Sequence, residues 1–321
     1  MKQDTLELRK RFVSDLKLPI QIINNDEIFE YFLDLYENTH SSRTKFEELN
    51  TLIEKRFNNN TSLFLNHYYE VRNKIIEDIL NREEYKTFNS MDMNKFKLEK
   101  NNLSSSNIYK ETNHNRKFIS IDLKKANFNA LKFVDPNILG IESDYTYEEF
   151  INKYTDLDYI ANSKYTRQVI FGKLNPSRHI TVEKYLINEC RKYIQDNYTE
   201  LSNVVSFCSD EIVFDITELN NIDEHKLNNI VNYLEKQYNI SLKIDIFVLL
   251  KHAFYTAQDN CKIVVYQKYH DGDEYIIPIG CPVFYYAQIF KYLNNIILED
   301  KDLYFMHESQ LSKFIFNLKY E

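Results

Sequence analysis

Apolar residues recur every three or four positions through about the first 90 residues of the chain. The segments NDEIFEYFLDLYENTH, SRTKFEELNTLIEKRF and NHYYEVRNKIIEDILNREEY show this spacing, with Asn or Ser at their starts. Such spacing gathers the apolar side chains on one face of a helix, and these polar residues favour helix starts. Between residues 91 and 116 the periodicity is lost and Asn, Ser and Lys gather, which marks a boundary. We therefore expect residues 1–115 to form a helical N-terminal region.

A strand pattern begins just after this boundary. In KFISIDLKKANFNALKF, Ile119, Ile121 and Leu123 alternate with Ser120 and Asp122. Alternation with a period of two predicts a strand, and the following residues change to helical spacing. The carboxylate of Asp122 is thus expected at the end of a strand.

The stretch NVVSFCSDEIVFDI, residues 203–216, sets the acidic pair Asp210 and Glu211 between two apolar runs. It predicts a hairpin with carboxylates at its tip. The following segments predict a helix, EHKLNNIVNYLEKQYN, and a strand, ISLKIDIFVLL. The order of strand, helices, hairpin, helix and strand predicts an α+β domain over residues 116–260, with an antiparallel sheet backed by helices.

The remaining segment, residues 261–321, is expected to form a C-terminal hairpin and helical cap. KIVVYQKYHDGDEYIIPIG predicts a hairpin around Asp271 and Gly272. FYYAQIFKYLNNII predicts a helix, and we expect the tail to continue this helical cap.

Composition narrows the class of protein. The chain has 321 residues, 43% of them hydrophobic, and a net charge of −8. A chain of this length and hydrophobic content can form a substantial core. The net negative charge argues against a protein that coats nucleic acid through overall basicity, but it is compatible with a local basic groove. The four glycines are too few for the glycine-rich phosphate loops of Rossmann and Walker sites. Any nucleotide chemistry must then use carboxylates and a metal ion.

Neither a membrane nor an oxidising compartment is indicated. The start MKQDTLELRKRF lacks the apolar segment of a signal peptide, and no apolar run reaches the roughly 18 residues that span a bilayer. The cysteines, Cys190, Cys208, Cys261 and Cys281, have no metal-binding or disulfide-framework spacing, so we expect reduced core thiols. The cytoplasm is the expected location.

Each acidic feature has a simple structural explanation when it is taken alone. An Asp-Glu pair suits a tight turn, and Asp122 could cap the helix that follows it. The combination is more informative, because the segment SKYTRQVIFGKLNPSRHI also places basic residues around Phe171 and Gly172. Two-metal phosphoryl transfer needs two carboxylates from separate elements and cations for the phosphates.

These motifs resemble those of right-hand polymerases. FCSDEIVFDI resembles motif C of family A DNA polymerases, with Ser209 in place of their His. SIDLKKANFNAL is similar to motif A, although it reads more like the Asp-Leu-x-x-Ala of reverse transcriptases. KYTRQVIFGKLNP loosely resembles the fingers helix of family A. The short spacing from Phe171 to Asp210 is that of reverse transcriptases, so the resemblance is to a right-hand palm rather than to one family.

The resemblance implies a palm in which Asp122 and Asp210 bind two Mg²⁺ or Mn²⁺ ions, with Glu211 as a weaker ligand or a supporting residue. It also implies contacts with a nucleotide. These are triphosphate contacts from Lys164, Arg167 and Lys173, stacking of Phe171 beneath the templating base pair, and a position under the ribose for Asn127.

We therefore expect a compact, template-dependent nucleotidyltransferase of the DNA polymerase kind, or a primase-like enzyme. Its partners would be nucleic acid template and primer, nucleoside triphosphates and an accessory protein. The abundance of Asn, Lys, Ile and Tyr suits an AT-rich phage or viral genome. Two alternatives stay open: a non-catalytic structural or interaction protein with a palm-like fold, and a metal-dependent nuclease.

Overall fold

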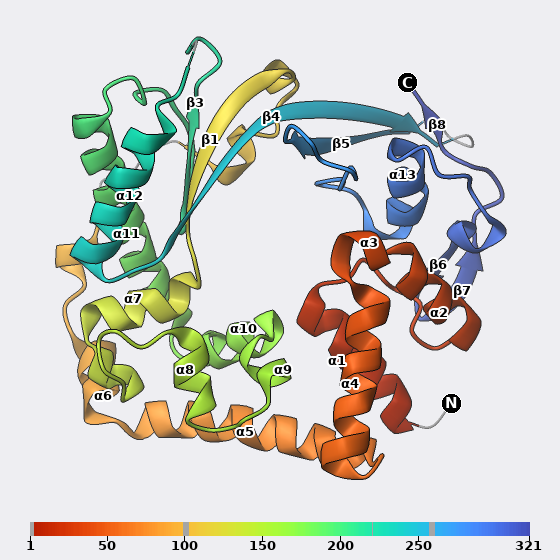
Figure 1. Ribbon diagram of the computed structural model, residues 1–321, viewed down its shortest axis with the longest axis horizontal. Helices are drawn as coiled ribbons and strands as arrows, with labels where there is room; N and C mark the ends of the chain where they lie inside the picture. Colours follow the sequence, from red (N-terminus) through yellow and green to blue (C-terminus); the bar gives the residue numbers. More distant parts are fainter. Residues whose placement is uncertain (1–2, 99–102, 220, 257–260) are drawn as a thin grey trace. The chain divides into compact units, whose positions relative to one another are not determined.

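The computed structural model describes residues 3–98, 103–219, 221–256 and 261–321 (Figure 1). The chain folds into two compact units, each assembled from separate stretches. The terminal unit comprises Met1–Tyr69, Ser163–Tyr165 and Leu249–Glu321. The central unit comprises Glu70–Asn162 and Thr166–Val248.

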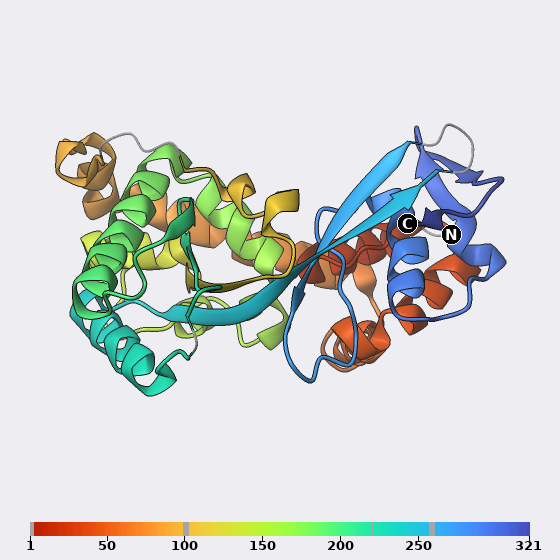
Figure 2. The ribbon, with the colours of Figure 1, turned by 90° about the horizontal axis from the view of Figure 1, so that it is seen from above.

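This division differs from the three consecutive regions expected from the sequence. Helix α5 (Thr61–Asn81) and strand β4 (Leu242–Tyr255) each run without interruption from one unit into the other. The long strand can be followed along its whole length in Figure 2. The expected boundary at residue 115 lies inside the central unit, and the one at residue 260 lies outside the described residues.

The sheet of the central unit has the strand order β2-β3-β1-β4. It contains β1 (Arg116–Leu123), β2 (Val204–Phe207), β3 (Glu211–Asp215) and the first part of β4. β3 runs antiparallel to both β1 and β2. The element order β-α-β-β-α-β is that of a split βαβ arrangement. The expected α+β fold, an antiparallel sheet backed by helices, is confirmed.

Helix α11 (Pro176–Asn197) is the main support of this sheet. It contacts α7 (Ala126–Val134), α12 (Glu224–Tyr238) and strands β1 and β3. It begins earlier than the Val182 start expected from the sequence, because Asn175 takes the left-handed conformation and Pro176 suits the first turn of a helix. Figure 1 shows α11 and α12 side by side.

The other helical elements of the central unit surround this layer. They are α6 (Glu83–Ser90), α8 (Tyr147–Asn152), α9 (Asp158–Ala161), most of α10 (Lys164–Gly172) and the short helices η1 (Asn94–Phe96), η2 (Ser105–Asn107), η3 (Glu111–Asn113) and η4 (Pro136–Leu139). The described residues between 91 and 115 thus form short 3₁₀ turns, in keeping with the loss of periodicity in that segment.

The terminal unit combines the N-terminal helices with the C-terminal strands. Its elements are α1 (Gln3–Leu16), α2 (Asp26–Leu35), α3 (Glu37–His40), α4 (Ser42–Phe57), β5 (Lys262–Tyr269), η5 (Val283–Tyr285), α13 (Tyr286–Leu293), η6 (Asp300–Leu303), β6 (Tyr304–His307), β7 (Gln310–Lys313) and β8 (Lys319–Tyr320). β4 has β5 and β8 as neighbours, whereas β6 and β7 form a separate hairpin.

Two C-terminal expectations are only partly met. β5 pairs with β4, and the residues after Gly272 return to β5 through a single bridge between Tyr266 and Ile279. The expected helix of the cap is present as α13, but the tail after it forms the short helix η6 and strands β6, β7 and β8, so it does not continue a helical cap. Glu308 and Ser309 both have positive φ, which is the geometry of a two-residue hairpin turn between β6 and β7.

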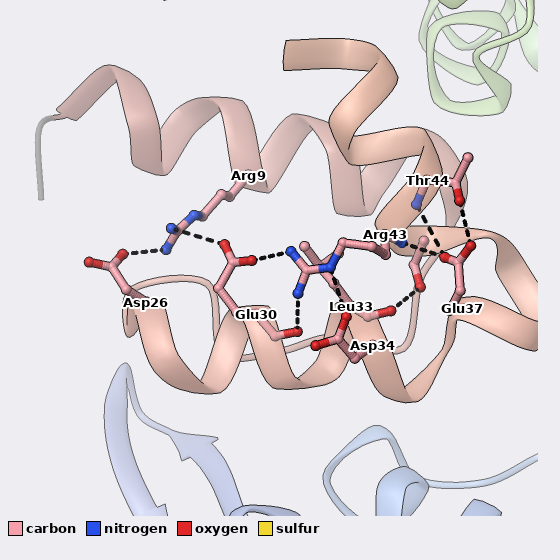
Figure 3. Close-up of polar contacts among 9 residues, drawn as sticks. Arg9, Asp26, Glu30, Leu33, Asp34, Glu37, Arg43 and Thr44 are labelled. Atoms are coloured by element: carbon pink, nitrogen blue, oxygen red, sulfur yellow. Dashed lines mark hydrogen bonds and ion pairs between the residues drawn. The ribbon is translucent and has the colours of Figure 1, made fainter. Parts of the chain in front are cut away.

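A polar network joins the N-terminal helices (Figure 3). Arg9 of α1 forms an ion pair with Asp26 at 2.8 Å, and Arg43 of α4 binds Glu30 and, at 2.7 Å, Asp34 of α2. Glu37 accepts a hydrogen bond from the Thr44 hydroxyl and, next, from the first-turn amides of α4, and these bonds lower its pKa. These contacts hold α2 and α4 together without a conventional side-chain cap on α4.

Candidate active site

The pairing of β1 with β3 brings the acidic residues of both motifs, Asp122, Asp210 and Glu211, to the same end of these two strands, which we call the acidic edge. In the antiparallel register Asp122 lies directly opposite Glu211. The amide of Leu123 donates a hydrogen bond to the carbonyl oxygen of Asp210 at 2.7 Å. Cross-strand neighbours in such a register have Cβ atoms about 5 Å apart. Asp122, Asp210 and Glu211 are therefore neighbours, and each is half-buried.

Hydrogen bonds orient the hairpin carboxylates. The hydroxyl of Ser120, which is 1% exposed and lies two residues before Asp122 on the same face of β1, donates to Glu211 Oε1. Asp210 Oδ1 accepts from the Ser209 hydroxyl at 3.3 Å and from the Cys208 thiol at 3.4 Å. Burial raises the pKa of Cys208 to about 11, so the thiol keeps its proton and can donate.

A fourth carboxyl group, Glu183 of α11, was not found by sequence reasoning. It is 2% exposed and accepts a hydrogen bond of 2.8 Å from Asn127 Nδ2. Burial, and next the charge of Asp210, raise the pKa of Glu183 to about 7. A signal was present, because Glu183 falls four residues before Ile187 on the apolar face of the helix. An acidic residue on such a face is unusual and needs a partner.

Basic residues gather around the ring of Tyr147, close to where β1 ends. The Lys125 ammonium lies 5.5 Å from the ring centroid and the Arg167 guanidinium 5.6 Å from it. Lys125 also forms an ion pair with Glu148 and has a φ of 49°, a left-handed conformation that is uncommon for a lysine. Arg167 is thus the member of the expected triphosphate-binding trio that lies with this group.

The two lysines expected beside Arg167 lie elsewhere. Lys164 is exposed and belongs to the terminal unit. Lys173 lines a surface groove with Asn73 and Ile76 of α5. The structure does not bring Lys173 to the Tyr147 ring, because α10 ends at Gly172 and the chain turns towards α11.

Phe171 is a core residue in this structure. It is 1% exposed, and its ring centroid lies 6.4 Å from that of Tyr147 and 6.2 Å from that of His179. Stacking on a base pair would require this side chain to leave the core. A Cβ added to Gly172 would meet no atom within 4 Å, so that glycine serves no close approach within the chain.

The chemistry of the acidic edge suits magnesium, whose sites commonly use one or two carboxylates together with water and substrate phosphates. Across the described residues, no group of three or more His, Cys, Asp and Glu side chains is already arranged to hold a metal ion. Asp122, at the end of β1, and Asp210, in the turn before β3, are half-buried and fit a site that is completed by a substrate. They are the residues that could hold the ion.

Comparison with known proteins gives no match: no protein-family model, no curated protein and no solved structure resembles this chain. Among the described helices, none is both long enough and apolar enough to cross a membrane.

Proposed function

We propose that the chain is a metal-dependent, template-directed nucleotidyltransferase with a palm-like sheet. The observation that carries this proposal is the register of β1 and β3, which sets Asp122 opposite Glu211 and beside Asp210. Asp122, at the end of β1, and Asp210, in the turn that leads into β3, supply the two carboxylates that two-metal phosphoryl transfer uses. The resemblance of the surrounding motifs to those of right-hand polymerases is the reason for proposing nucleotidyl transfer as the reaction.

In the proposed reaction, the 3′-hydroxyl oxygen of a primer attacks the α-phosphorus of a nucleoside triphosphate and pyrophosphate leaves. Asp122 and Asp210 would hold Mg²⁺ or Mn²⁺, and the bound ions would stabilise the charge on the phosphate oxygens. Ser120 fixes Glu211 beside this pair as a supporting carboxylate. Arg167 supplies a cation suited to bidentate phosphate contacts.

Asn127 is the residue that we place under the sugar. Its amide nitrogen donates to Glu183, and the side chain is half-buried next to the acidic edge. An amide there can form a hydrogen bond to a ribose hydroxyl, in contrast to a bulky aromatic side chain. Acceptance of ribonucleotides is therefore part of the proposal. The cytoplasm is the compartment that we propose, because all four cysteines are free thiols.

The test is primer extension on DNA and RNA templates with Mg²⁺ or Mn²⁺, offering ribonucleotides and deoxyribonucleotides in turn. Asp122→Asn and Asp210→Asn should each lower extension at least a hundredfold, because removing one metal ligand disables the site. Asp196→Asn is the matched control, since Asp196 is exposed on α11. The circular dichroism spectra of all variants should match the wild type.

Absence of extension by the wild-type chain under every condition would contradict the proposal. Degradation of the primer that is lost in both active-site variants would identify a nuclease instead. Binding of nucleic acid without any reaction would favour a non-catalytic protein.

A further inference from the structure

A cavity of about 210 Å³ lies within the central unit at the end of β1. Its walls come from the start of α7 with the residues before it, from residues 144–148 and from residues 239–241. The volume is below the roughly 300–1,000 Å³ of sites that enclose drug-sized ligands. The cavity therefore suits a small group and not a whole nucleotide.

Cations are concentrated in this wall. Lys124, Lys125 and Lys132 line the cavity, against the carboxylates of Asp144 and Glu148. Glu148 is paired with Lys125. Outside that pair the wall carries two ammonium groups and one carboxylate, so an anion would meet a net positive charge.

Lys132 is the most informative of the three lysines. It is 8% exposed, and its ammonium lies 5.6 Å from the centroid of the Phe128 ring. Its hydrogen bond goes to the carbonyl oxygen of Tyr145 at 3.3 Å, and within the described part of the chain it has no ion pair. Burial lowers its pKa, and the charge of Asp144 partly offsets this effect. A buried cation with so little compensation is costly, and a bound anion would supply the missing countercharge.

The start of α7 points to the same ligand chemistry. Lys125 stands at its N-cap position, ahead of the first-turn amides, and its side chain makes no capping hydrogen bond to them. The helix dipole and these amides favour an anion at the N-terminus. Phe128, in that first turn, and Lys125 both line the cavity.

We propose that this cavity binds a chain of phosphate groups, with Lys132 and Lys124 as its principal cations. An entering phosphate would also compete with Glu148 for Lys125. The cavity and its lysines alone support anion binding. The identification of the anion as the phosphate chain of a nucleotide rests on the proposed function. The other source of the same chemistry is free pyrophosphate or polyphosphate.

The test is calorimetric titration with inorganic tripolyphosphate and with pyrophosphate, at constant ionic strength and without divalent ions. Lys132→Met removes the buried charge and keeps an unbranched side chain that is one atom shorter, and it should weaken binding at least tenfold. Lys86→Met is the matched control, because Lys86 is an exposed lysine of α6. If Lys132→Met does not fold, Lys124→Gln, an exposed position at the rim, gives the same comparison.

Equal affinities of wild type and Lys132→Met, or no binding by the wild type, would overturn the inference. A loss of the same size in Lys86→Met would also overturn it, since binding would then be unspecific. Titration with a nucleoside triphosphate and with its nucleoside shows whether the bound phosphate chain belongs to a nucleotide or is free pyrophosphate or polyphosphate. Tripolyphosphate binding in a chain that extends no primer would leave the anion site standing and refute the enzyme.

Discussion

His179 shows how one buried residue links pH to stability. Its side chain is fully buried on α11 between the rings of Phe88 and Phe171. Burial lowers its pKa from 6.5 to about 4. Between these two values the unfolded chain binds a proton that the folded chain does not. The contribution of His179 to the free energy of unfolding is therefore fully present above pH 6.5 and is lost as the pH falls towards 4.

We predict that His179→Leu removes this dependence. For the wild type, His179 alone should lower the free energy of unfolding by about 2–3 kcal/mol between pH 7.5 and pH 4.5. Urea unfolding of both proteins at the two pH values measures the difference. Glu183 titrates in the same window with the opposite sign, but it is present in both proteins and its effect cancels. Equal pH dependence in the two proteins would contradict the assignment.

At the residue level, a position could be predicted from the sequence where the backbone pattern alone decides it. Asp122 follows from the alternation of β1, and Asp210 from the hairpin, so their meeting needed only the strand order. Glu183 and Lys132 were missed because each lies in a helix whose burial depends on packing against other elements. A sequence pattern shows that a residue is polar, but the fold decides whether that residue is buried.

At the scale of elements, the Arg43 network fixes α4 against α2. The guanidinium donates to the carbonyl oxygen of Glu30 at 2.8 Å and to Asp34 at 2.7 Å, and it pairs with the Glu30 carboxylate. Its carboxylate partners are substantially exposed, with 42% and 67% of their side chains accessible. Solvent screening therefore limits the strength of these ion pairs.

We predict that Arg43→Ala lowers the free energy of unfolding by about 1–2 kcal/mol, mainly through lost hydrogen bonds to charged groups. Lys55→Ala in the same helix should change it by less than about 0.5 kcal/mol, because Lys55 is exposed. Thermal unfolding at low and high salt measures both variants. The Arg43 effect should shrink with salt, and a loss no larger than that of Lys55→Ala would refute the structural role.

Most elements were predictable from periodicity, and the failures have physical causes. The helices before residue 90, strand β1 and the hairpin follow from local patterns. The tail was expected to continue the helical cap, and its strands were not recognised because short strands contain too few repeats of the alternating pattern. In the structure, a turn at Glu308 and Ser309 joins β6 and β7 into a hairpin. In the hairpin expected around Gly272, the residues after the turn do not form a strand. β5, the first arm of that expected hairpin, pairs with β4 instead.

At the scale of the whole molecule, the two units cut across the order of the chain. The terminal unit joins the first helices to the last strands, and α5 and β4 pass from one unit to the other. Sequence composition could not reveal this arrangement, because no change of periodicity marks a crossing inside a continuous helix or strand. The acidic edge and the cavity that we propose for phosphate groups both belong to the central unit, so the proposed chemistry requires groups from that unit.

The central claim is that Asp122 and Asp210 act together as ligands of a divalent cation. The most direct measurement is titration with Mn²⁺, following the electron paramagnetic resonance signal of the free ion. The wild type should bind Mn²⁺, Asp122→Asn and Asp210→Asn should each weaken binding at least tenfold, and Asp196→Asn should bind as the wild type does. Equal binding by all four proteins, or none by the wild type even with a nucleoside triphosphate present, would contradict the claim.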